Sequence, residues 1–311
     1  MGQGITVVGS LNADLVVAVR RFPAPGETVT GHDFAVFSGG KGANQAYAAA
    51  RLAGKEMPVR MLGQVGNDSY AEWLRKNLSD VGVDVSQVAT DANAPTGLAL
   101  VALDASGQNQ IIVVPGANGT FNPGTLTRLH HTIAGSAVVL LQLEIPLPTV
   151  QTAARIGREG GALVIFDPAP ARVIPDGLLR SIHYLTPNES ELAVLTGAAP
   201  QSPLRRGDAV SRARQLIARG VAKVIVKMGR QGVLLVSETN EQLVPAFPVE
   251  VVDTTAAGDA FNAGFAFALA TGSSEVDAIR FGAAAGAVSV TRHGAQPSLP
   301  TRAEVEALLR N

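Results

Sequence analysis

Cysteine is absent from this chain of 311 residues, and the formal net charge is only −1. Without cysteine there is no disulfide framework and no thiolate metal site, which agrees with a reducing compartment. The near-zero charge offers no basic excess to neutralise phosphates, so we expect neither nucleic acid nor an anionic membrane as a partner. No apolar run reaches the roughly 18 residues that span a bilayer, and no signal peptide is recognisable. These absences predict a cytoplasmic protein whose partners are small molecules.

Three common motifs are missing as well. The five histidines do not show the His-Glu-x-x-His spacing of a zinc site, and we assign none of them to a metal. The chain has no Walker A motif, and no Gly-x-Gly-x-x-Gly fingerprint follows its first predicted strand. Any nucleotide must therefore be held by a different arrangement.

Apolar strands alternate with helical segments along most of the chain. Apolar runs predict strands at 6–8, 137–141, 162–166 and 223–226, and alternation predicts another at 248–252. Helices are predicted at 42–52, 70–78, 209–218, 260–270 and 276–291. Buried strands separated by helices are typical of a mostly parallel sheet that is covered on both faces. The predicted fold class is therefore α/β, with a three-layer α/β/α core.

Two regions interrupt this alternation, namely residues 11–38 and residues 95–114. Both resemble consecutive strands with no helix between them. They either pair into a small sheet of their own or form two edge hairpins of the main sheet. The first arrangement divides the chain into a core (1–10, 39–94 and 115–311) and a small sheet (11–38 and 95–114).

The run Asp253-Thr-Thr-Ala-Ala-Gly-Asp259 lies between a predicted strand and a predicted helix. The first N–H groups of a helix lack intrahelical partners and carry the positive end of its dipole, so they can hold a phosphate. Ala256, Ala257 and Gly258 are small enough to let a phosphate approach the backbone. Asp259 is favoured in its ionised form there and could accept the proton of a hydroxyl that attacks the phosphoryl group. The alternative is that Asp259 only stabilises the start of the helix.

Several motifs resemble those of the ribokinase-like, phosphofructokinase B (PfkB)-type carbohydrate kinases. The run 253–259 resembles the C-terminal signature of that family, and Ser38-Gly-Gly-Lys-Gly-Ala-Asn-Gln-Ala46 resembles its sugar site. Segments 9–14 and 22–30 resemble the ribokinase branch in particular. Further matches lie at 142–144, 167–172, 186–189 and 294–298. The resemblance covers nearly the whole chain and implies an ATP-dependent kinase that phosphorylates the 5-hydroxyl of D-ribose.

The resemblance also implies roles for individual residues around the sugar. The sugar would be held by Asn12, Asp14, Gly40, Lys41, Asn44 and Glu144. Asp259 would be the base, and the amides of residues 256–258 would form the anion hole. Taken alone, Asn12 and Asp14 also fit an ordinary turn at a strand end, and Lys41 fits a solvated loop charge.

At the nucleotide end, the resemblance implies an ATP site made of Asn188, Lys227, Gly229, Gly232, Gly258 and Ala283. Asn188 and Glu191 would organise Mg²⁺ and phosphate, largely through water, which suits a cation that keeps its hydration shell. A helix N-cap followed by an exposed glutamate would look the same at 188–191, as would a simple hairpin turn at 227–232.

Members of the ribokinase branch also bind a monovalent cation, so the resemblance implies K⁺ as an activator. The corresponding positions are Asp253, Thr255, Ser289, Arg292, Gly294 and Ser298. One departure from the family pattern is Ala256, which stands where many relatives have glycine. Its methyl group should fit if the residue adopts helical backbone angles.

The resemblance implies, finally, that the small sheet is a lid over the sugar and the contact of a homodimer. Alternative substrates within the family are 2-deoxyribose, fructose and a nucleoside such as pseudouridine. A different class of protein, a sugar-binding regulator without catalysis, would keep the fold without the chemistry. The presence of Asp259, Asn188 and Glu191 favours an enzyme.

Overall fold

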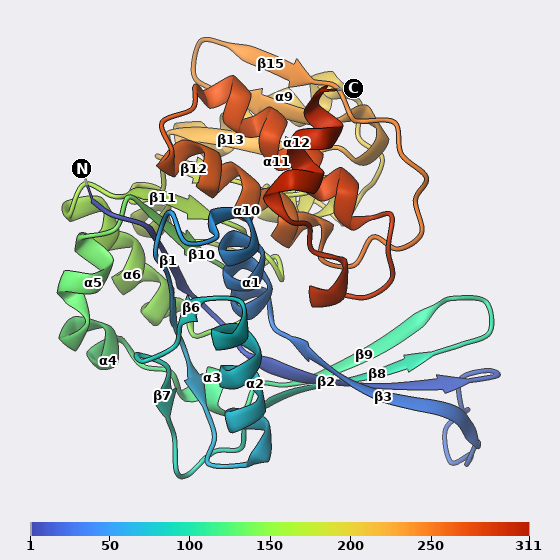
Figure 1. Ribbon diagram of the computed structural model, residues 1–311. Helices are drawn as coiled ribbons and strands as arrows, with labels where there is room; N and C mark the ends of the chain where they lie inside the picture. Colours follow the sequence, from blue (N-terminus) through green and yellow to red (C-terminus); the bar gives the residue numbers. More distant parts are fainter. Residues whose placement is uncertain (1, 311) are drawn as a thin grey trace.

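The computed structural model describes residues 2–310 and is built on a nine-stranded sheet, shown in Figure 1. The strand order is β15-β14-β13-β12-β11-β10-β1-β4-β6. Neighbouring strands are parallel from β6 to β13, and β14 and β15 are added antiparallel at one edge. The strands are β1 (Ile5–Val8), β4 (Val59–Leu62), β6 (Val83–Asp84), β10 (Val138–Leu141), β11 (Leu163–Phe166), β12 (Tyr184–Leu185), β13 (Lys223–Lys227), β14 (Val233–Val236) and β15 (Glu241–Val244).

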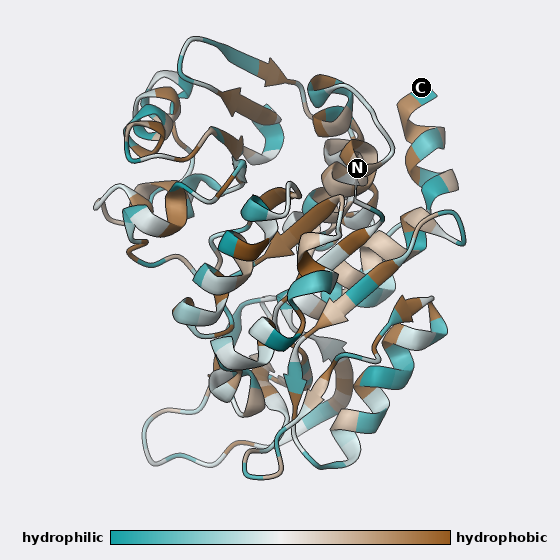
Figure 2. Ribbon diagram, turned by 90° about the vertical axis from the view of Figure 1, so that its left-hand side faces the viewer, coloured by the Kyte–Doolittle hydropathy of each residue, from teal (hydrophilic) through white to brown (hydrophobic). Residues whose placement is uncertain are grey.

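Both faces of this sheet are buried, because successive residues of a strand point to opposite faces and both sets are apolar. Val138 and Leu140 belong to one hydrophobic cluster, whereas Val139 and Leu141 belong to the other. In Figure 2 the strands of the interior are correspondingly brown. The first cluster includes residues of α1 (Lys41–Ala53), α2 (Ser69–Asp80), α10 (Ala257–Ala270), α11 (Glu275–Ser289) and α12 (Arg302–Arg310). The second includes residues of α4 (Pro123–Arg128), α5 (His130–Ala134), α6 (Leu147–Glu159), α7 (Asp176–Leu179), α8 (Glu189–Leu195) and α9 (Arg206–Ala218). The predicted three-layer α/β/α core is confirmed.

A second sheet projects from this body (Figure 1). It has four strands in the order β3-β2-β8-β9, and β2 pairs with β8 in parallel. The strands are β2 (Asn12–Val19), β3 (Gly31–Gly39), β8 (Gly97–Leu103) and β9 (Asn109–Val114). The predicted small sheet therefore exists, and the alternative of two edge hairpins on the main sheet is wrong. A short third sheet pairs β5 (Gln64–Val65) with β7 (Ala89–Thr90), and α3 (Ala117–Thr120) follows β9.

The sequence prediction was wrong at residues 248–252, which do not form a strand. This segment leaves the edge strand β15 and runs towards α10 without pairing in the sheet. Its alternation has another cause, because Val249 and Val251 line a cavity described below. No helix among residues 2–310 is both long and apolar enough to cross a bilayer.

Candidate active site

Polar side chains gather where the parallel strands end, at their carboxyl edge. Glu144 follows β10, Asp167 follows β11 and Asn188 follows β12. Lys41 begins α1, and Asp259 lies in the first turn of α10. In open α/β sheets ligands bind at this edge. The fold thus brings together residues that are far apart in the sequence.

Asp259 is buried, with only 5% of its surface exposed. Asn44 Nδ2 donates to its Oδ2 at 3.0 Å, and Gln45 Nε2 donates to its Oδ1 at 3.0 Å. Burial raises the pKa of Asp259 to about 6, and the Asp167 carboxylate adds to this, while Lys41 and the two amide donors oppose it. A carboxylate with a pKa close to neutral, held at a helix N-terminus, has the properties of a general base.

Ala256 precedes this helix with φ 59° and ψ 9°, which is the left-handed region. The condition under which its methyl group was expected to fit, helical backbone angles, is therefore not met. Ala256 is the only residue other than glycine with positive φ in the part of the chain that the structure describes. The turn between Asp253 and α10 requires this conformation, whichever residue occupies the position.

Ala256→Gly should therefore leave the protein as stable or make it more stable. A left-handed alanine costs about 1–2 kcal/mol, and the added freedom of glycine in the unfolded chain offsets about 0.4–1 kcal/mol of the relief. We expect the free energy of unfolding, measured by urea denaturation, to rise by up to about 1 kcal/mol. Ala257→Gly is the matched control, since Ala257 is helical, and it should lose about 0.5–1 kcal/mol. If Ala256→Gly lowered the free energy of unfolding as much as this control does, Ala256 would not be strained in the wild type.

The residues predicted to hold a sugar lie beside Asp259, on the side of the small sheet. Glu144 Oε2 accepts from Ser10 Oγ at 2.5 Å and from the Lys41 backbone N–H at 2.9 Å. Asn12 is buried, and its Oδ1 accepts from Asn118 Nδ2 at 2.8 Å. Gly40 has φ 88°, and a Cβ there would lie 2.8 Å from the Asn12 backbone nitrogen, so the close approach of these two segments requires glycine.

Asp14 on β2 carries an unusual carboxyl group. A Cβ on Gly39 would lie only 2.0 Å from Asp14 Oδ2, so Gly39 provides the space that this carboxylate occupies. Burial and, to a smaller extent, the nearby Glu144 charge together raise the pKa of Asp14 to about 7. Asp14 therefore titrates near neutral pH when no ligand is present.

Lys41 is the cation that offsets these carboxylates. Burial alone would lower its pKa, but Asp259, Asp167, Glu144 and Glu191 together hold the pKa above its ordinary value. Its ammonium group is thus charged at any pH at which the protein works. The simple reading of Lys41 as a solvated loop charge is wrong.

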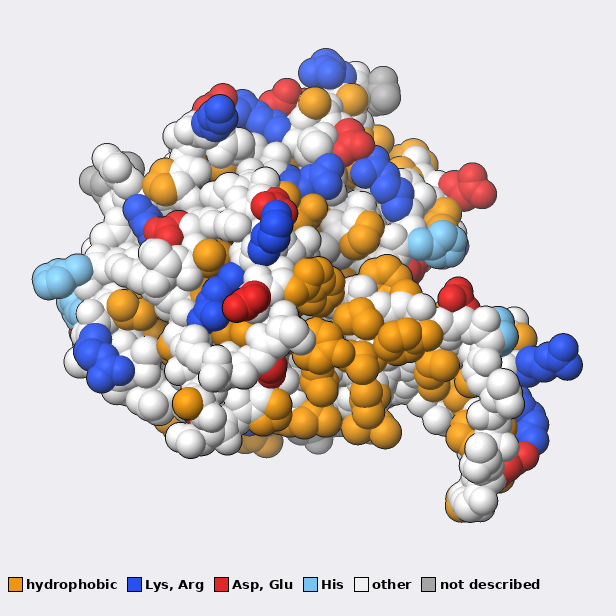
Figure 3. Space-filling view, turned by 60° about the horizontal axis from the view of Figure 1, so that its bottom comes forward, with side chains coloured by type: hydrophobic (Ala, Val, Ile, Leu, Met, Phe, Trp, Pro, Cys, Tyr) orange, Lys and Arg blue, Asp and Glu red, His pale blue; other side chains and the backbone are white. Residues whose placement is uncertain are grey.

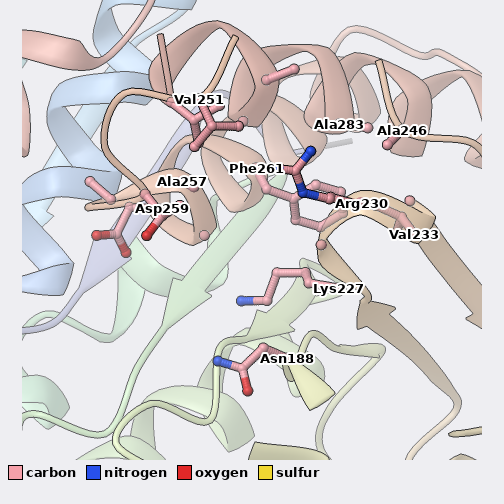
Figure 4. Close-up of a pocket in the computed structure, with 18 of the residues that line it drawn as sticks. Asn188, Lys227, Arg230, Val233, Ala246, Val251, Ala257, Asp259, Phe261 and Ala283 are labelled. Atoms are coloured by element: carbon pink, nitrogen blue, oxygen red, sulfur yellow. The ribbon is translucent and has the colours of Figure 1, made fainter. Parts of the chain in front are cut away.

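A cavity of about 820 Å³ opens on the other side of Asp259. Figure 4 shows Asp259 at one end of it, Val233 and Ala246 at the other, and Lys227 between them. Its lining includes all the residues predicted to bind ATP. They are Asn188, Lys227, Gly229, Gly232, Gly258 and Ala283. Phe247, Val249 and Val251 add an apolar wall. A cavity of this size with an apolar wall and a charged end suits a nucleotide.

At the charged end, Lys227 Nζ donates to Asp167 Oδ1 at 3.0 Å. Burial would lower the pKa of Lys227, but the charges of Asp167 and Glu191 raise it overall. A Cβ on Gly258 would lie 3.2 Å from Lys227 Nζ, so this ammonium group faces the amides at the start of α10. The loop after Lys227 is a hairpin turn between β13 and β14 that also lines the cavity.

Asn188 and Glu191 form a capping box at the start of α8. Asn188 Oδ1 accepts from the Glu191 N–H at 2.8 Å, and Glu191 Oε2 accepts from the Asn188 N–H at 2.8 Å. Their spacing therefore has the structural role that the N-cap alternative describes. Both residues also line the cavity. Burial raises the pKa of Glu191, and the Lys227 charge opposes this.

Some of the residues predicted to bind a monovalent cation lie together. Asp253 Oδ1 accepts from Thr255 Oγ1 at 2.6 Å, and Asp253 Oδ2 accepts from the Gly294 N–H at 2.8 Å. Ser289 and Ser298 are buried, and their hydroxyls donate to the carbonyls of Gly286 and Ala295 at 2.8 Å each. The side chain of Arg292 instead pairs with Glu304, so only its backbone is free for such a role.

Three buried side chains in this region had no role in the sequence prediction: Gln45, Gln142 and Asp167. Gln45 Nε2 donates to Asp167 Oδ2 at 3.1 Å as well as to Asp259. The position of Asp167 directly after a buried strand was a usable signal. For the glutamines, the available signal was that Gln45 and Gln142 lie within the segments 38–46 and 142–144, which resemble family motifs.

Comparison with known proteins agrees with this geometry. The family model for pfkB family carbohydrate kinases matches residues 3–302. The chain therefore belongs to the pfkB family of carbohydrate kinases. It is 39% identical over 311 residues to a ribokinase of Haemophilus influenzae, covering 100% of both chains. It is 40% identical over 307 residues to a ribokinase of Bacillus subtilis, covering 99% of each. The structure of Arabidopsis thaliana ribokinase complexed with ribose and ATP is 36% identical, with a TM-score of 0.93 and 100% coverage of both chains.

Proposed function

We propose that this protein is an ATP-dependent kinase that transfers the γ-phosphoryl group to the 5-hydroxyl of D-ribose, giving ribose 5-phosphate and ADP. The observation that carries the proposal is the place of Asp259, a buried carboxylate between the cavity and the polar side chains of β2 and α1. The full-length similarity to proteins named ribokinase supports ribose as the sugar.

The sugar is held by Asn12, Asp14, Gly40, Lys41, Asn44 and Glu144. Their polar groups match the hydroxyls of a furanose, and a sugar lacking a partner hydroxyl leaves one of them unpaired in a buried site, at about 1–3 kcal/mol. The ionised Asp259 takes the proton of the 5-hydroxyl as the oxygen attacks the γ-phosphorus. The bond from that phosphorus to the bridging oxygen of ADP breaks at the same time.

The amides of Ala256, Ala257 and Gly258 stabilise the charge on the transferring phosphoryl group. Asn188, Lys227, Gly229, Gly232 and Ala283 hold ATP, and the Lys227 ammonium lies near those amides. Asn188 and Glu191 would orient Mg²⁺, mainly through water molecules bound to it. Among residues 2–310 no group of three or more carboxylates or histidines forms a metal cage, which suits a hydrated cation bound to phosphate. When bound, Mg²⁺ neutralises charge on the phosphate oxygens.

We also propose that K⁺ binds beside the anion hole. The proposed ligands are Asp253, Thr255, Ser289, Arg292, Gly294 and Ser298, with Arg292 acting through its carbonyl. The contacts of Asp253 with Thr255 and Gly294 support this, because they hold the segment around Gly294 against the turn before α10. Replacement of K⁺ by tetramethylammonium should lower the turnover, and an unchanged rate would remove the site.

The substrate is tested with a panel of sugars in an assay that couples ADP release to NADH oxidation. The panel consists of D-ribose, 2-deoxyribose, fructose and pseudouridine. We expect the highest kcat/KM for ribose. A clear preference for another sugar would replace ribose in the proposal. Sugar binding without ADP formation would instead support a non-catalytic regulator.

The small sheet, made of residues 11–38 and 95–114, is proposed to act as a lid and a dimer contact. Asn12 and Asp14 lie on one of its faces, since side chains alternate along β2. By the strand register, the opposite face carries Phe34, Leu100 and Ile112. These side chains are 61%, 42% and 65% exposed, and Figure 3 shows hydrophobic side chains gathered on this part of the molecule. An apolar face backing a sugar site suits burial against the lid of a second copy.

Ile112→Asp should therefore convert a dimer into monomers, because a carboxylate on this face would have to be buried unpaired. Sedimentation velocity measures the change, and the dissociation constant should rise at least about 100-fold, from a cost of roughly 3 kcal/mol. Val173→Asp is the matched control, since Val173 is 80% exposed and lies outside the small sheet. A wild-type protein that is monomeric at high concentration would contradict the proposed contact.

A further inference from the structure

A chain of buried side-chain amides ends at Asp259. Gln45 on α1 is fully buried, and its Nε2 donates to Asp259 Oδ1 at 3.0 Å and to Asp167 Oδ2 at 3.1 Å. Since both acceptors are carboxylates, the nitrogen of Gln45 must face them and its oxygen must face away. Gln142 Nε2 donates to that oxygen at 2.6 Å. The orientation of each amide is thus determined by its neighbour.

Gln142 is itself held by the backbone around it. It follows β10, is fully buried, and its Oε1 lies against Gly9. A Cβ on Gly9 would lie 2.1 Å from that oxygen, so the glycine provides the space for the side chain. Gln142 Oε1 has no hydrogen-bond partner among the described residues. Gln142 is therefore fixed by its packing against Gly9 and by the hydrogen bond that it donates to Gln45.

Gln45 also lies between two like charges. The charged groups that act on Asp259 are Lys41 at the start of α1 and Asp167 after β11. Lys227 on β13 pairs with the other oxygen of Asp167, and Glu144 and Glu191 act on Lys41. The Gln45 amide is the group that donates to both Asp259 and Asp167. It holds the two carboxylates in fixed positions despite their repulsion.

We propose that Gln45, oriented by Gln142, is the positioning residue for the catalytic base. By holding Oδ1 of Asp259, it directs Oδ2, the oxygen next to Asn44, towards the sugar hydroxyl. A mispositioned carboxylate misses the short contact that proton transfer requires. This inference rests on the proposed function, in which Asp259 is the base.

Gln45→Met tests the inference, because methionine has a similar length and cannot donate a hydrogen bond. We expect kcat with ribose at pH 7 to fall about 10- to 100-fold, the loss of a hydrogen bond to a charged group, while KM for ribose changes less than about threefold. The acid limb of the kcat profile should move to higher pH, because the ionised carboxylate loses a donor. Part of the rate should return at pH 8 to 9. Gln142→Met should shift the limb in the same direction by less.

The control is Gln87→Met, which removes a half-buried amide that donates to Thr132, away from the site. It should leave kcat and its pH profile unchanged. An unshifted acid limb and an unchanged kcat in Gln45→Met would overturn the positioning role while leaving Asp259 as the base. Normal turnover in Asp259→Asn would overturn the base and this inference together. If Gln45→Met does not fold, Gln142→Met tests the proposal instead, because Gln142 does not contact Asp259. An unshifted acid limb of the kcat profile in Gln142→Met would overturn the positioning role of Gln45.

Discussion

Asp259→Asn should lower kcat about 100- to 10,000-fold, the usual contribution of a general base. Asparagine keeps the size of the side chain and cannot accept the proton of the sugar hydroxyl. The amide nitrogen would also meet the donors Asn44 Nδ2 or Gln45 Nε2 where the wild type has an acceptor. Ribose binding should remain measurable by isothermal titration calorimetry, because the other sugar contacts are intact. Turnover within about tenfold of the wild type would contradict a general base at this position.

The same residue predicts how the wild-type rate depends on pH. The base must be ionised, and the pKa of Asp259 is raised to about 6 by its burial. The rate should therefore increase with pH through about 6 and level off above pH 7. Below pH 5 it should fall about tenfold for each further pH unit. A rate that stays constant between pH 5 and 7 would show that this carboxyl does not limit catalysis.

The sequence predicted the architecture because its signals are local. The apolar runs of β1, β10, β11 and β13 appear as strands since both faces of the main sheet are buried. The strand prediction at residues 248–252 failed because apolar and polar residues alternate wherever a segment has one apolar face. Such a face can pack in a sheet or line a cavity. The left-handed conformation of Ala256 was not predicted from the sequence either, because an alanine carries no sequence signal for positive φ.

The site was predictable only in part, for a related physical reason. Asp259 and Lys41 stand at predicted helix starts and could be found by inspection. Gln45 lies within the motif at 38–46, but its contacts could not be predicted, because its partners Gln142 and Asp259 lie 97 and 214 residues away along the chain. Hydrogen bonds between residues so far apart in the sequence depend on the folded topology. The residues next to a glutamine in a helix do not predict them.

Asp14→Asn should weaken ribose binding about 10- to 100-fold, the second large effect we expect. An ionised carboxylate accepts hydrogen bonds from sugar hydroxyls, and each such bond to a charged group contributes about 1.5–3 kcal/mol. Asparagine retains one acceptor oxygen and presents an amide that cannot accept. The dissociation constant, measured by calorimetry without nucleotide, should rise while the fold is retained. Leu15→Met is a suitable control, because the half-buried Leu15 side chain lies on the other face of β2 from Asp14.

The pH dependence of binding separates charge from shape at Asp14. Its pKa is raised to about 7 by burial, so about half of the free protein carries a neutral Asp14 at that pH. If the ionised form binds ribose, affinity must increase as pH rises through about 7 and then become constant. Below that pH the dissociation constant should grow by up to tenfold per unit. In Asp14→Asn the same curve should be nearly flat between pH 6 and 8, because the titrating group is gone. A wild-type curve that is already flat would show that the protonation of Asp14 does not control ribose binding in this pH range.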